Sequence, residues 1–424
     1  MRWATGVLAV VVAVPAAAQQ VEVTLPEAIQ RALLVQPAMV QARGDDRNAG
    51  ASYRAALGAF LPTVSTSASA LRNSTPRRDP NTDVVYPPGY SYSVGLGANV
   101  DLFDGFRRFA DRSAAGATSD AAQAGVVNQR FQVALQTKQA FYNALATEEL
   151  VRVAGSQVRR AQQQLQISIE KLRAGSATRS DSLRSTVDYG NARIALLQAQ
   201  ANLATAQANL GRQIGVDQPV RAVPDTTLPP PPDTAALRAI AIEATPQVEQ
   251  ADAQAHAAGA QLTSARAQYL PTLSLSYSNS QNSLDPPWQG LSGYNESFSW
   301  RFGVSWTLFN GLTRERNQVS ASAARDLARA RAADTRRMVS AQLIQQLAAI
   351  ATTYEQISIA RANVAAATED LRVQNERYRV GAATILDLLT SQTALTEAEQ
   401  NLVQTRFNYL IARAEVEALV GRTL

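Results

Sequence analysis

The sequence predicts a chain of two structural repeats, in which long coiled-coil helices continue into β-hairpins that enter a membrane. Three observations predict this class. Segment 60–69 returns with small changes at 269–278, and segment 171–185 returns at 377–391, which is the mark of a duplicated unit. Apolar residues recur every seven positions along the helical segments, as in left-handed coiled coils. Elsewhere apolar and polar residues alternate strictly, as they do in strands with two different faces.

The chain divides by composition into four expected parts. A positively charged start, a short apolar run and a small-residue cleavage site predict a signal peptide at 1–18, and therefore export. Repeat one is expected at 19–216 and repeat two at 234–424. Between them, residues 217–233 are rich in proline, which fixes φ and removes backbone donors, so an extended linker is expected. No later segment has the ~20 apolar residues of a membrane-spanning helix, so only strands are expected to cross a membrane.

Composition argues against catalysis and against nucleic-acid binding. The formal net charge is only +5 over 424 residues, which provides little attraction for a polyanion. The chain has no cysteine and a single histidine, His256, so thiol chemistry, multi-histidine metal sites and histidine-based catalysis are all unsupported. We therefore expect neither an enzyme nor a cofactor nor a structural metal.

Two β-hairpins are expected, at about 62–103 and about 271–309. Their second strands alternate most clearly, between apolar residues on one face and mostly Ser, Gly, Asn or Asp on the other. Aromatic residues gather toward the strand ends, as in the interface girdles of membrane strands. The alternative is the edge of a soluble sandwich, although the polar face carries few long charged side chains.

Four strands are too few to close a barrel, and open strand edges in lipid leave backbone groups unpaired. Several copies must therefore pool their hairpins, and three copies would supply twelve strands around a water-filled lumen. The helices at 106–172 and 312–378 follow these strands without a linker. At ~1.5 Å per residue, each would reach roughly 100 Å. We expect them to continue the barrel as a helical cylinder.

Several motifs resemble the outer-membrane efflux protein family, of which TolC is the type member. They are the segment Arg377-Tyr-Arg-Val-Gly-Ala-Ala-Thr-Ile-Leu-Asp387, the segment Phe407-Asn-Tyr-Leu410, and the Tyr-Leu-Pro and Leu-Phe-Asn-Gly corners at Tyr269 and Leu308. The resemblance extends from about Leu25 to Leu424. It implies a homotrimeric, TolC-like channel-tunnel, with a twelve-stranded barrel in the outer membrane and a helical cylinder in the periplasm. It also implies docking through a periplasmic adaptor (membrane fusion) protein onto an inner-membrane pump.

The turns between the helices of each repeat are candidate contact sites. Gly175 and Gly381 allow the positive φ that ends a helix, and Arg173, Arg379 and Val380 flank them. The resemblance implies that these tips meet the adaptor. The alternative is ordinary helix capping, with the cations placed favourably at a helix C-terminus.

Two acidic residues at matched positions are candidates for the periplasmic entrance. Asp181 and Asp387 either stabilise a helix N-terminus or line the mouth, where three copies would form an acidic ring that binds cations. The resemblance implies the ring for the position of Asp387. Thr390 stands where a second acid often follows. Tyr378 and Asp181 match positions that link the closed mouth, and Ala383 replaces a basic partner.

The function expected from these features is a passive export duct for small toxic compounds or drugs, opened when it docks with an adaptor and a pump. One alternative is the outer-membrane component of a type I protein secretion system. A third, from a different class, is a secreted coiled-coil structural protein, which would contain no membrane strands.

Overall fold

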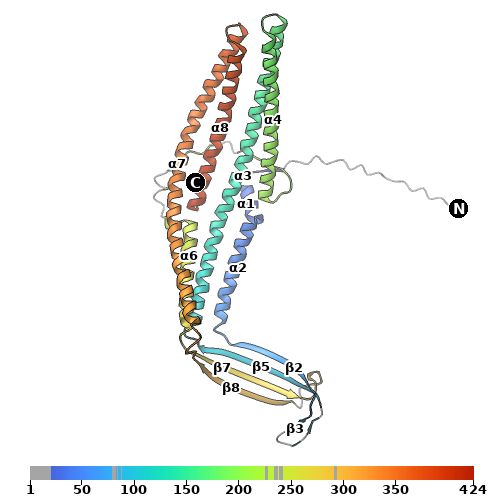
Figure 1. Ribbon diagram of the computed structural model, residues 1–424, viewed down its shortest axis with the longest axis vertical. Coiled ribbons are helices and arrows are strands. Elements are labelled where there is room, and N and C mark those ends of the chain that lie inside the picture. Colours follow the sequence, from blue (N-terminus) through green and yellow to red (C-terminus); the bar gives the residue numbers. More distant parts are fainter. Residues whose placement is uncertain are drawn as a thin grey trace, which may run out of the picture. The chain divides into compact units, whose positions relative to one another are not determined.

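A computed structural model describes most of the chain (Figure 1). The described residues are 21–78, 83, 85–86, 88–224, 228–233, 237, 242–290 and 294–424. The expected signal peptide, 1–18, lies outside them. The chain divides into two compact units. The helical unit comprises described residues within 1–41, 128–241 and 340–424, and the sheet unit those within 42–127 and 242–339.

The two repeats contain helices of identical length. Helix α3, Arg107–Arg173, and helix α7, Thr313–Arg379, each have 67 residues. Helix α4, Arg179–Ile214, and helix α8, Ile385–Val420, each have 36. The starts differ by 206 residues in both pairs (313 − 107 and 385 − 179). The long helices agree with the predicted 106–172 and 312–378 to within one residue.

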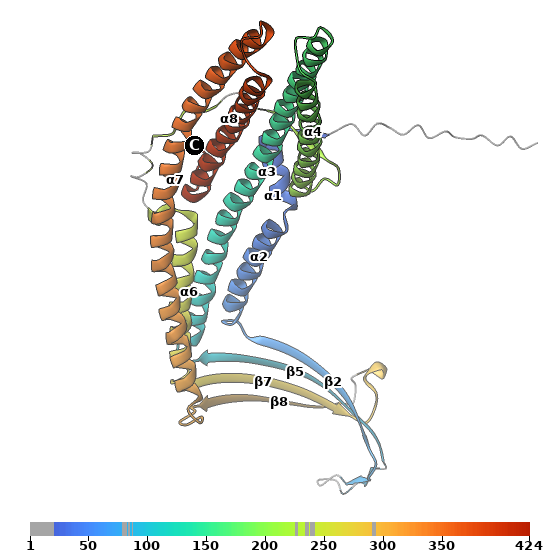
Figure 2. The ribbon, with the colours of Figure 1, turned by 45° about the horizontal axis from the view of Figure 1, so that its top comes forward.

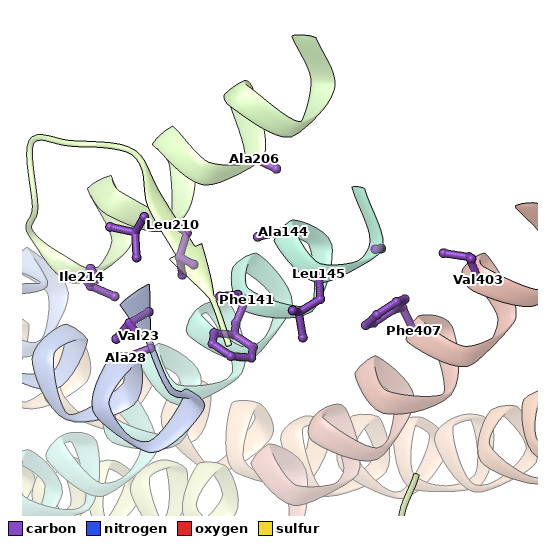
Figure 3. Packing of buried hydrophobic residues seen from close by; sticks show 13 residues of the cluster. Val23, Ala28, Phe141, Ala144, Leu145, Ala206, Leu210, Ile214, Val403 and Phe407 are labelled. Carbon is purple, nitrogen blue, oxygen red and sulfur yellow. The ribbon is translucent and has the colours of Figure 1, made fainter. Parts of the chain in front are cut away.

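The core of the helical unit lies where α3, α4 and α8 pack together (Figure 3). Phe141 of α3 is 1% exposed and Leu210 of α4 is fully buried. Val403 and Phe407 of α8 belong to the same cluster. A second cluster joins α7 to α8 through Ile350 and neighbouring residues. These contacts bury the apolar positions of the heptads, which is why the helices pack as coiled coils.

Short elements that the sequence analysis did not identify complete the helical unit. Strand β1, Val21–Val23, pairs in parallel with strand β6, Val220–Ala222, and helix α1, Leu25–Val35, follows β1. The C-terminal end of α4 lies against α1, because a Cβ at Gly215 would stand 2.8 Å from a methyl group of Val35. Three-residue strands are too short to show an alternating pattern in sequence.

The proline-rich segment packs against α8. The Tyr409 hydroxyl donates to the Pro229 carbonyl at 3.0 Å, and the Arg413 guanidinium donates to the Pro230 carbonyl at 3.0 Å. Leu228 packs against the apolar cluster between α7 and α8. Proline carbonyls remain good acceptors although the ring nitrogen donates nothing. Residues 225–227 of the expected linker lie outside the described residues.

The sheet unit contains the four predicted strands in one antiparallel sheet of order β2-β5-β7-β8 (Figure 2). The strands are β2, Thr63–Asn73; β5, Gly89–Phe103; β7, Thr272–Ser283; and β8, Asn295–Ser305. Strands β2 and β8 therefore form the two edges. Two-residue strands β3, Arg77–Arg78, and β4, Val85–Tyr86, pair separately.

Strand β8 is shorter than its alternating pattern indicates. The pattern continues to Leu308, whereas the strand ends at Ser305. Beyond it, the Trp306 indole donates to the Tyr269 carbonyl at 3.2 Å, and Arg314 donates to the carbonyls of Thr307 and Leu308 at 2.7 and 2.8 Å. Because side chains here donate hydrogen bonds to backbone carbonyls, the strand ladder ends early.

The large apolar side chains of β8 face outward. Phe298, Trp300 and Phe302 are 69%, 65% and 61% exposed. They lie on one face of the strand and alternate with small or polar residues. A contiguous exposed apolar face of this kind marks an interaction surface or contact with lipid. Among the described residues, no helix has the length and apolarity needed to span a membrane.

Each hairpin turns into its long helix through two consecutive left-handed residues. Gly105 and Phe106 have φ of 69° and 64°, and Gly311 and Leu312 have φ of 66° and 64°. Before the first turn, the Asp104 carboxylate accepts from the Arg108 backbone N–H at 2.9 Å, which caps α3. Helix α6, Pro246–Ala267, and most of α2, Pro37–Gly58, also belong to the sheet unit.

Candidate functional site at the helix-hairpin tips

Both tips end their long helix in the same way. At the first tip, Gly175 has φ of 72°, its N–H donates to the Leu172 carbonyl at 3.1 Å, and the next N–H donates to the Lys171 carbonyl at 2.9 Å. Gly381 has φ of 82° and repeats both bonds at the second tip. This is the Schellman arrangement, which satisfies the last carbonyls of a helix. Apart from the adjoining residues, no atom in the described part of the chain lies within 4 Å of a Cβ built on either glycine. Glycine is therefore required by the backbone conformation and not by crowding.

Both predicted acids take part in a capping box at the start of the return helix. The Asp387 Oδ2 accepts from the Thr384 backbone N–H at 2.9 Å and from its hydroxyl at 2.7 Å, and the Thr384 Oγ1 accepts from the Asp387 N–H at 3.2 Å. Thr178 and Asp181 make the same three contacts in repeat one. These hydrogen bonds engage Oδ2 of each acid. The capping role that the sequence left open is therefore present at both tips.

The electrostatics of Asp387 favour the charged carboxylate. The hydrogen bond from the Thr384 hydroxyl lowers the pKa of Asp387, with smaller contributions from the Thr384 backbone N–H and the charge of Arg377. Hydrogen bonds to the ionised form stabilise it relative to the protonated form. Asp387 is also exposed, so its negative charge is available to a cation.

Tyr378 is packed between the two tips. It is 7% exposed and belongs to an apolar cluster with Ile385 and Leu388 of its own hairpin. The ammonium group of Lys171, from the other hairpin, donates to the Tyr378 carbonyl and lies 4.2 Å from the centre of its ring. The Tyr378 hydroxyl is buried and has no hydrogen-bond partner among the residues that the structure describes. Lys171 therefore joins repeat one to repeat two at the tips.

The other predicted site residues are at the surface. Arg173, Arg379 and Val380 are exposed, Val380 by 75%. The Thr390 hydroxyl donates to the Leu386 carbonyl at 2.9 Å. The structure thus gathers all predicted residues near the two turns, but places Asp181 and Asp387 in separate capping boxes.

Sequence reasoning missed three residues that organise the tips, Lys171, Thr178 and Thr384. The threonines were detectable, because Thr-x-x-Asp at a helix start is a capping-box pattern. Lys171 had no such signal, since its partner is a backbone carbonyl 207 residues away. Within the described parts of the chain, no group of three or more His, Cys, Asp or Glu side chains is arranged to hold a metal ion.

Comparison with known proteins agrees with the fold. The family model described as outer membrane efflux protein matches residues 28–216 and 237–422. This covers nearly the whole chain, so the chain belongs to the outer membrane efflux protein family. The family consists of transport proteins and not of enzymes.

Curated relatives are similar over most of their length. The outer membrane efflux protein BepC of Brucella suis is 25% identical over 376 residues, which cover 86% of this chain and 78% of BepC. Protein CyaE of Bordetella pertussis is 28% identical over 398 residues, covering 90% and 80%. The toluene efflux pump outer membrane protein TtgC of Pseudomonas putida is 23% identical over 383 residues, covering 88% and 77%.

Solved structures show the same fold. The outer membrane protein VceC of Vibrio cholerae has a TM-score of 0.79 at 18% identity, covering 94% of this chain and 97% of VceC. The TolC-like fold class expected from the sequence is confirmed. The chain is an outer-membrane efflux channel protein.

Proposed function

We propose that three copies of this chain form the outer-membrane duct of a tripartite efflux system, which exports small toxic compounds from the periplasm. The observation that carries this proposal is the open four-stranded sheet in a chain of the outer membrane efflux protein family. Small toxic compounds are the favoured cargo because the similar protein TtgC belongs to a toluene efflux pump.

The sheet edges support assembly from several copies. Strands β2 and β8 are the edges of an antiparallel sheet with an even number of strands. The last strand therefore runs opposite to the first strand of a second copy, and an antiparallel ladder can continue from copy to copy. Open edges in lipid leave unpaired N–H and C=O groups. Three copies supply twelve strands, enough for a channel with a water-filled lumen.

The exposed side chains of β8 support contact with outer-membrane lipid. Phe298, Trp300 and Phe302 project from one face of an edge strand. Strands of about 10 residues tilted by ~45° cross a bilayer, and β8 has 11 residues. The helices then extend into the periplasm.

The exposed tips are the proposed contact with the periplasmic adaptor, through which the duct meets an inner-membrane pump. Arg173, Arg379 and the apolar Val380 are accessible, and Gly175 and Gly381 form turns closed by backbone hydrogen bonds. A preformed tip loses little conformational entropy when it binds. Charge reversal at Arg379 should weaken binding of a purified adaptor, and the same change at Arg54, an exposed residue of the sheet unit, serves as control. Equal binding by both variants would contradict the assignment.

Asp387 is proposed to form a cation-binding ring at the periplasmic entrance, with Asp181, Tyr378 and Thr390 nearby. A ring of three carboxylates attracts multivalent cations, and the capping bonds to Oδ2 keep the carboxylate of Asp387 ionised and oriented. With Thr390 in place of a second acid, the ring carries three charges in all.

Planar-bilayer conductance tests this entrance and the duct together. Asp387→Asn removes the charge and keeps an oxygen that accepts the Thr384 bonds, so the block by divalent and trivalent cations should weaken. Ser180→Asn, at an exposed position in the first turn of α4 at the other tip, controls for the substitution itself. Unchanged block would remove Asp387 from the entrance. Absence of any channel conductance from a correctly folded, outer-membrane-extracted protein, with and without the adaptor, would contradict the duct.

A further inference from the structure

A cavity of about 980 Å³ lies within the helical unit, where α1, α3, α8 and the proline-rich segment meet. Sites that bind small molecules have volumes of roughly 300–1,000 Å³ and mostly apolar walls with a few polar groups. The apolar part of this wall consists of Leu25, Ile29, Phe141, Leu145, Phe407 and Leu410. Figure 3 shows Phe407 of α8 pointing toward Leu145 of α3. The cavity is therefore large enough for a small molecule and offers it an apolar surface from both repeats.

The cavity is elongated along the seam between α3 and α8. At one end Arg406 of α8 pairs with Glu149 of α3, and at the other Glu417 of α8 pairs with Lys138 of α3. All four residues line the cavity. The two charged positions of each helix are 11 residues apart (417 − 406 and 149 − 138), a rise of ~16 Å at ~1.5 Å per residue. The apolar residues of both helices lie between these ends, so the cavity fits an elongated molecule.

Basic side chains outnumber acidic ones in the lining. Five basic and three acidic side chains line the cavity, a net charge of +2: Lys138, Arg152, Arg221, Arg406 and Arg413 against Glu148, Glu149 and Glu417. Arg221 pairs with Glu148 at 2.8 Å and also with Glu22, which is outside the lining, at 3.1 Å. The net charge with Glu22 included is +1. The cavity therefore favours an anion.

The positive charge is least compensated at Arg406. Its Nη1 lies 3.5 Å from the Glu149 Oε2, whereas charge-assisted hydrogen bonds of this type measure about 2.7–2.9 Å. Arg152 shares the same carboxylate, with its Nη2 3.2 Å from the Glu149 Oε1. The Arg406 Nε is buried and has no hydrogen-bond partner among the described residues. Two guanidinium groups thus depend on one carboxylate, and Arg406 retains unused donors.

The basic side chains at the opposite end of the cavity have more partners. Lys138 donates to the Glu417 carboxylate. Arg413 donates to the Pro230 carbonyl at 3.0 Å, in addition to its ion pair with Glu417. The end of the cavity at Arg406 is therefore the place that suits the acid group of a ligand.

We propose that this cavity binds an elongated amphiphilic anion, with its acid group at Arg406 and its apolar body along the seam between α3 and α8. Removal of the apolar body from water drives binding, and the guanidinium group selects the acid. The acid also balances the second positive charge beside Glu149. Every residue of the site belongs to one chain, so the inference does not depend on the proposed assembly of several copies.

Photolabelling in isolated outer membranes tests this site. The probe is a dodecanoic acid that carries a diazirine at the far end of its chain, and the control probe is the corresponding dodecanol, which has the same chain and no charge. After irradiation, the protein is purified and digested, and the labelled residues are mapped by mass spectrometry. The acid should label residues 138–145 of α3 or 410–417 of α8 at least about ten times more than the alcohol, because a hydrogen bond to a charged group contributes such a factor. Equal labelling by both probes, or no labelling of the cavity, would overturn the proposal.

Two substitutions at the acid end should have opposite effects on this labelling. Arg406→Gln removes the partner of the acid group, and labelling should fall at least about tenfold; glutamine already stands at the corresponding position of repeat one, Gln200. Glu149→Gln removes the competing carboxylate, so labelling should rise. Arg361→Gln, at an exposed position of α7 outside the lining, is the matched control and should change nothing. A fall in both test variants, or no change in either, would overturn the proposal.

Organic extraction of the purified, unlabelled protein distinguishes two sources of such an anion. A fatty acid or an acidic phospholipid that co-purifies with the wild type and is depleted in Arg406→Gln identifies membrane lipid as the source. An extract with neither, from a protein whose cavity the acid probe labels, identifies a soluble amphiphilic acid of the periplasm. Either result is consistent with the site, and only the labelling decides whether it exists.

Discussion

Replacing Gly105 by alanine should destabilise the sheet unit much more than the same change at its counterpart Gly311. Both glycines begin the turn from a hairpin into a long helix, and their φ values are 69° and 66°. Their surroundings differ. A Cβ at Gly105 would lie 2.7 Å from the Ala267 carbonyl oxygen and 2.7 Å from the Leu270 Cβ, whereas none of the atoms described lies within 4 Å at Gly311.

The expected magnitudes follow from these two effects. A left-handed conformation costs alanine roughly 1–2 kcal/mol relative to glycine, and this applies at both positions. At Gly105 the methyl group also forces backbone atoms apart, and overpacking of this kind costs typically 1–3 kcal/mol. We therefore expect a loss of about 1–2 kcal/mol for Gly311→Ala and about 2–5 kcal/mol for Gly105→Ala.

Tryptophan fluorescence during unfolding by guanidinium measures the difference in stability between the two variants within the sheet unit. The three tryptophans outside the expected signal peptide, Trp288, Trp300 and Trp306, all belong to the sheet unit. The unfolding midpoint should fall in the order wild type, Gly311→Ala, Gly105→Ala, with similar slopes. Equal shifts for the two variants would refute the contact of the first turn with Ala267 and Leu270.

Two further predictions concern charged groups of the helical unit. Lys138→Met should lower the free energy of unfolding by about 3 kcal/mol. Glu417, whose side chain is 11% exposed, loses one cation and, among the described residues, keeps only Arg413 at 3.7 Å. A double change of Lys138 and Glu417 to methionine that loses as much would contradict this explanation. Thr384→Val should raise the pKa of Asp387 toward its ordinary value of 3.8, since the hydroxyl hydrogen bond that lowers it most disappears while the bond from the backbone N–H remains. The lowered pKa contributes stability above pH 3.8 that is lost as pH falls through the folded value. Because the Asp387 carboxylate is protonated at a higher pH in Thr384→Val, cation block in planar bilayers should also vanish at a higher pH. An unshifted profile would contradict this prediction.

The repeat, the helices and the strands were predictable because they depend on local periodicity. A seven-residue apolar repeat and a two-residue alternation each identify an element without knowledge of its neighbours. The repeat matches Gly175 with Gly381 at an offset of 206 residues, which predicted a turn at each position. The positive φ found at both glycines agrees with that prediction. The capping boxes were also readable in principle, since Thr and Asp lie three residues apart.

Contacts between residues far apart in the chain were decided only by the tertiary structure. Lys171 reaches a backbone carbonyl, which any residue type would provide, so no sequence pattern reports it. The pairing of β1 with β6 joins strands of three residues whose partners are about 200 positions apart. The early end of β8 at Ser305 depends on Arg314 and Trp306, whose side chains bond to backbone groups outside the ladder. Periodicity determines which face of an element is apolar, and packing determines what that face meets.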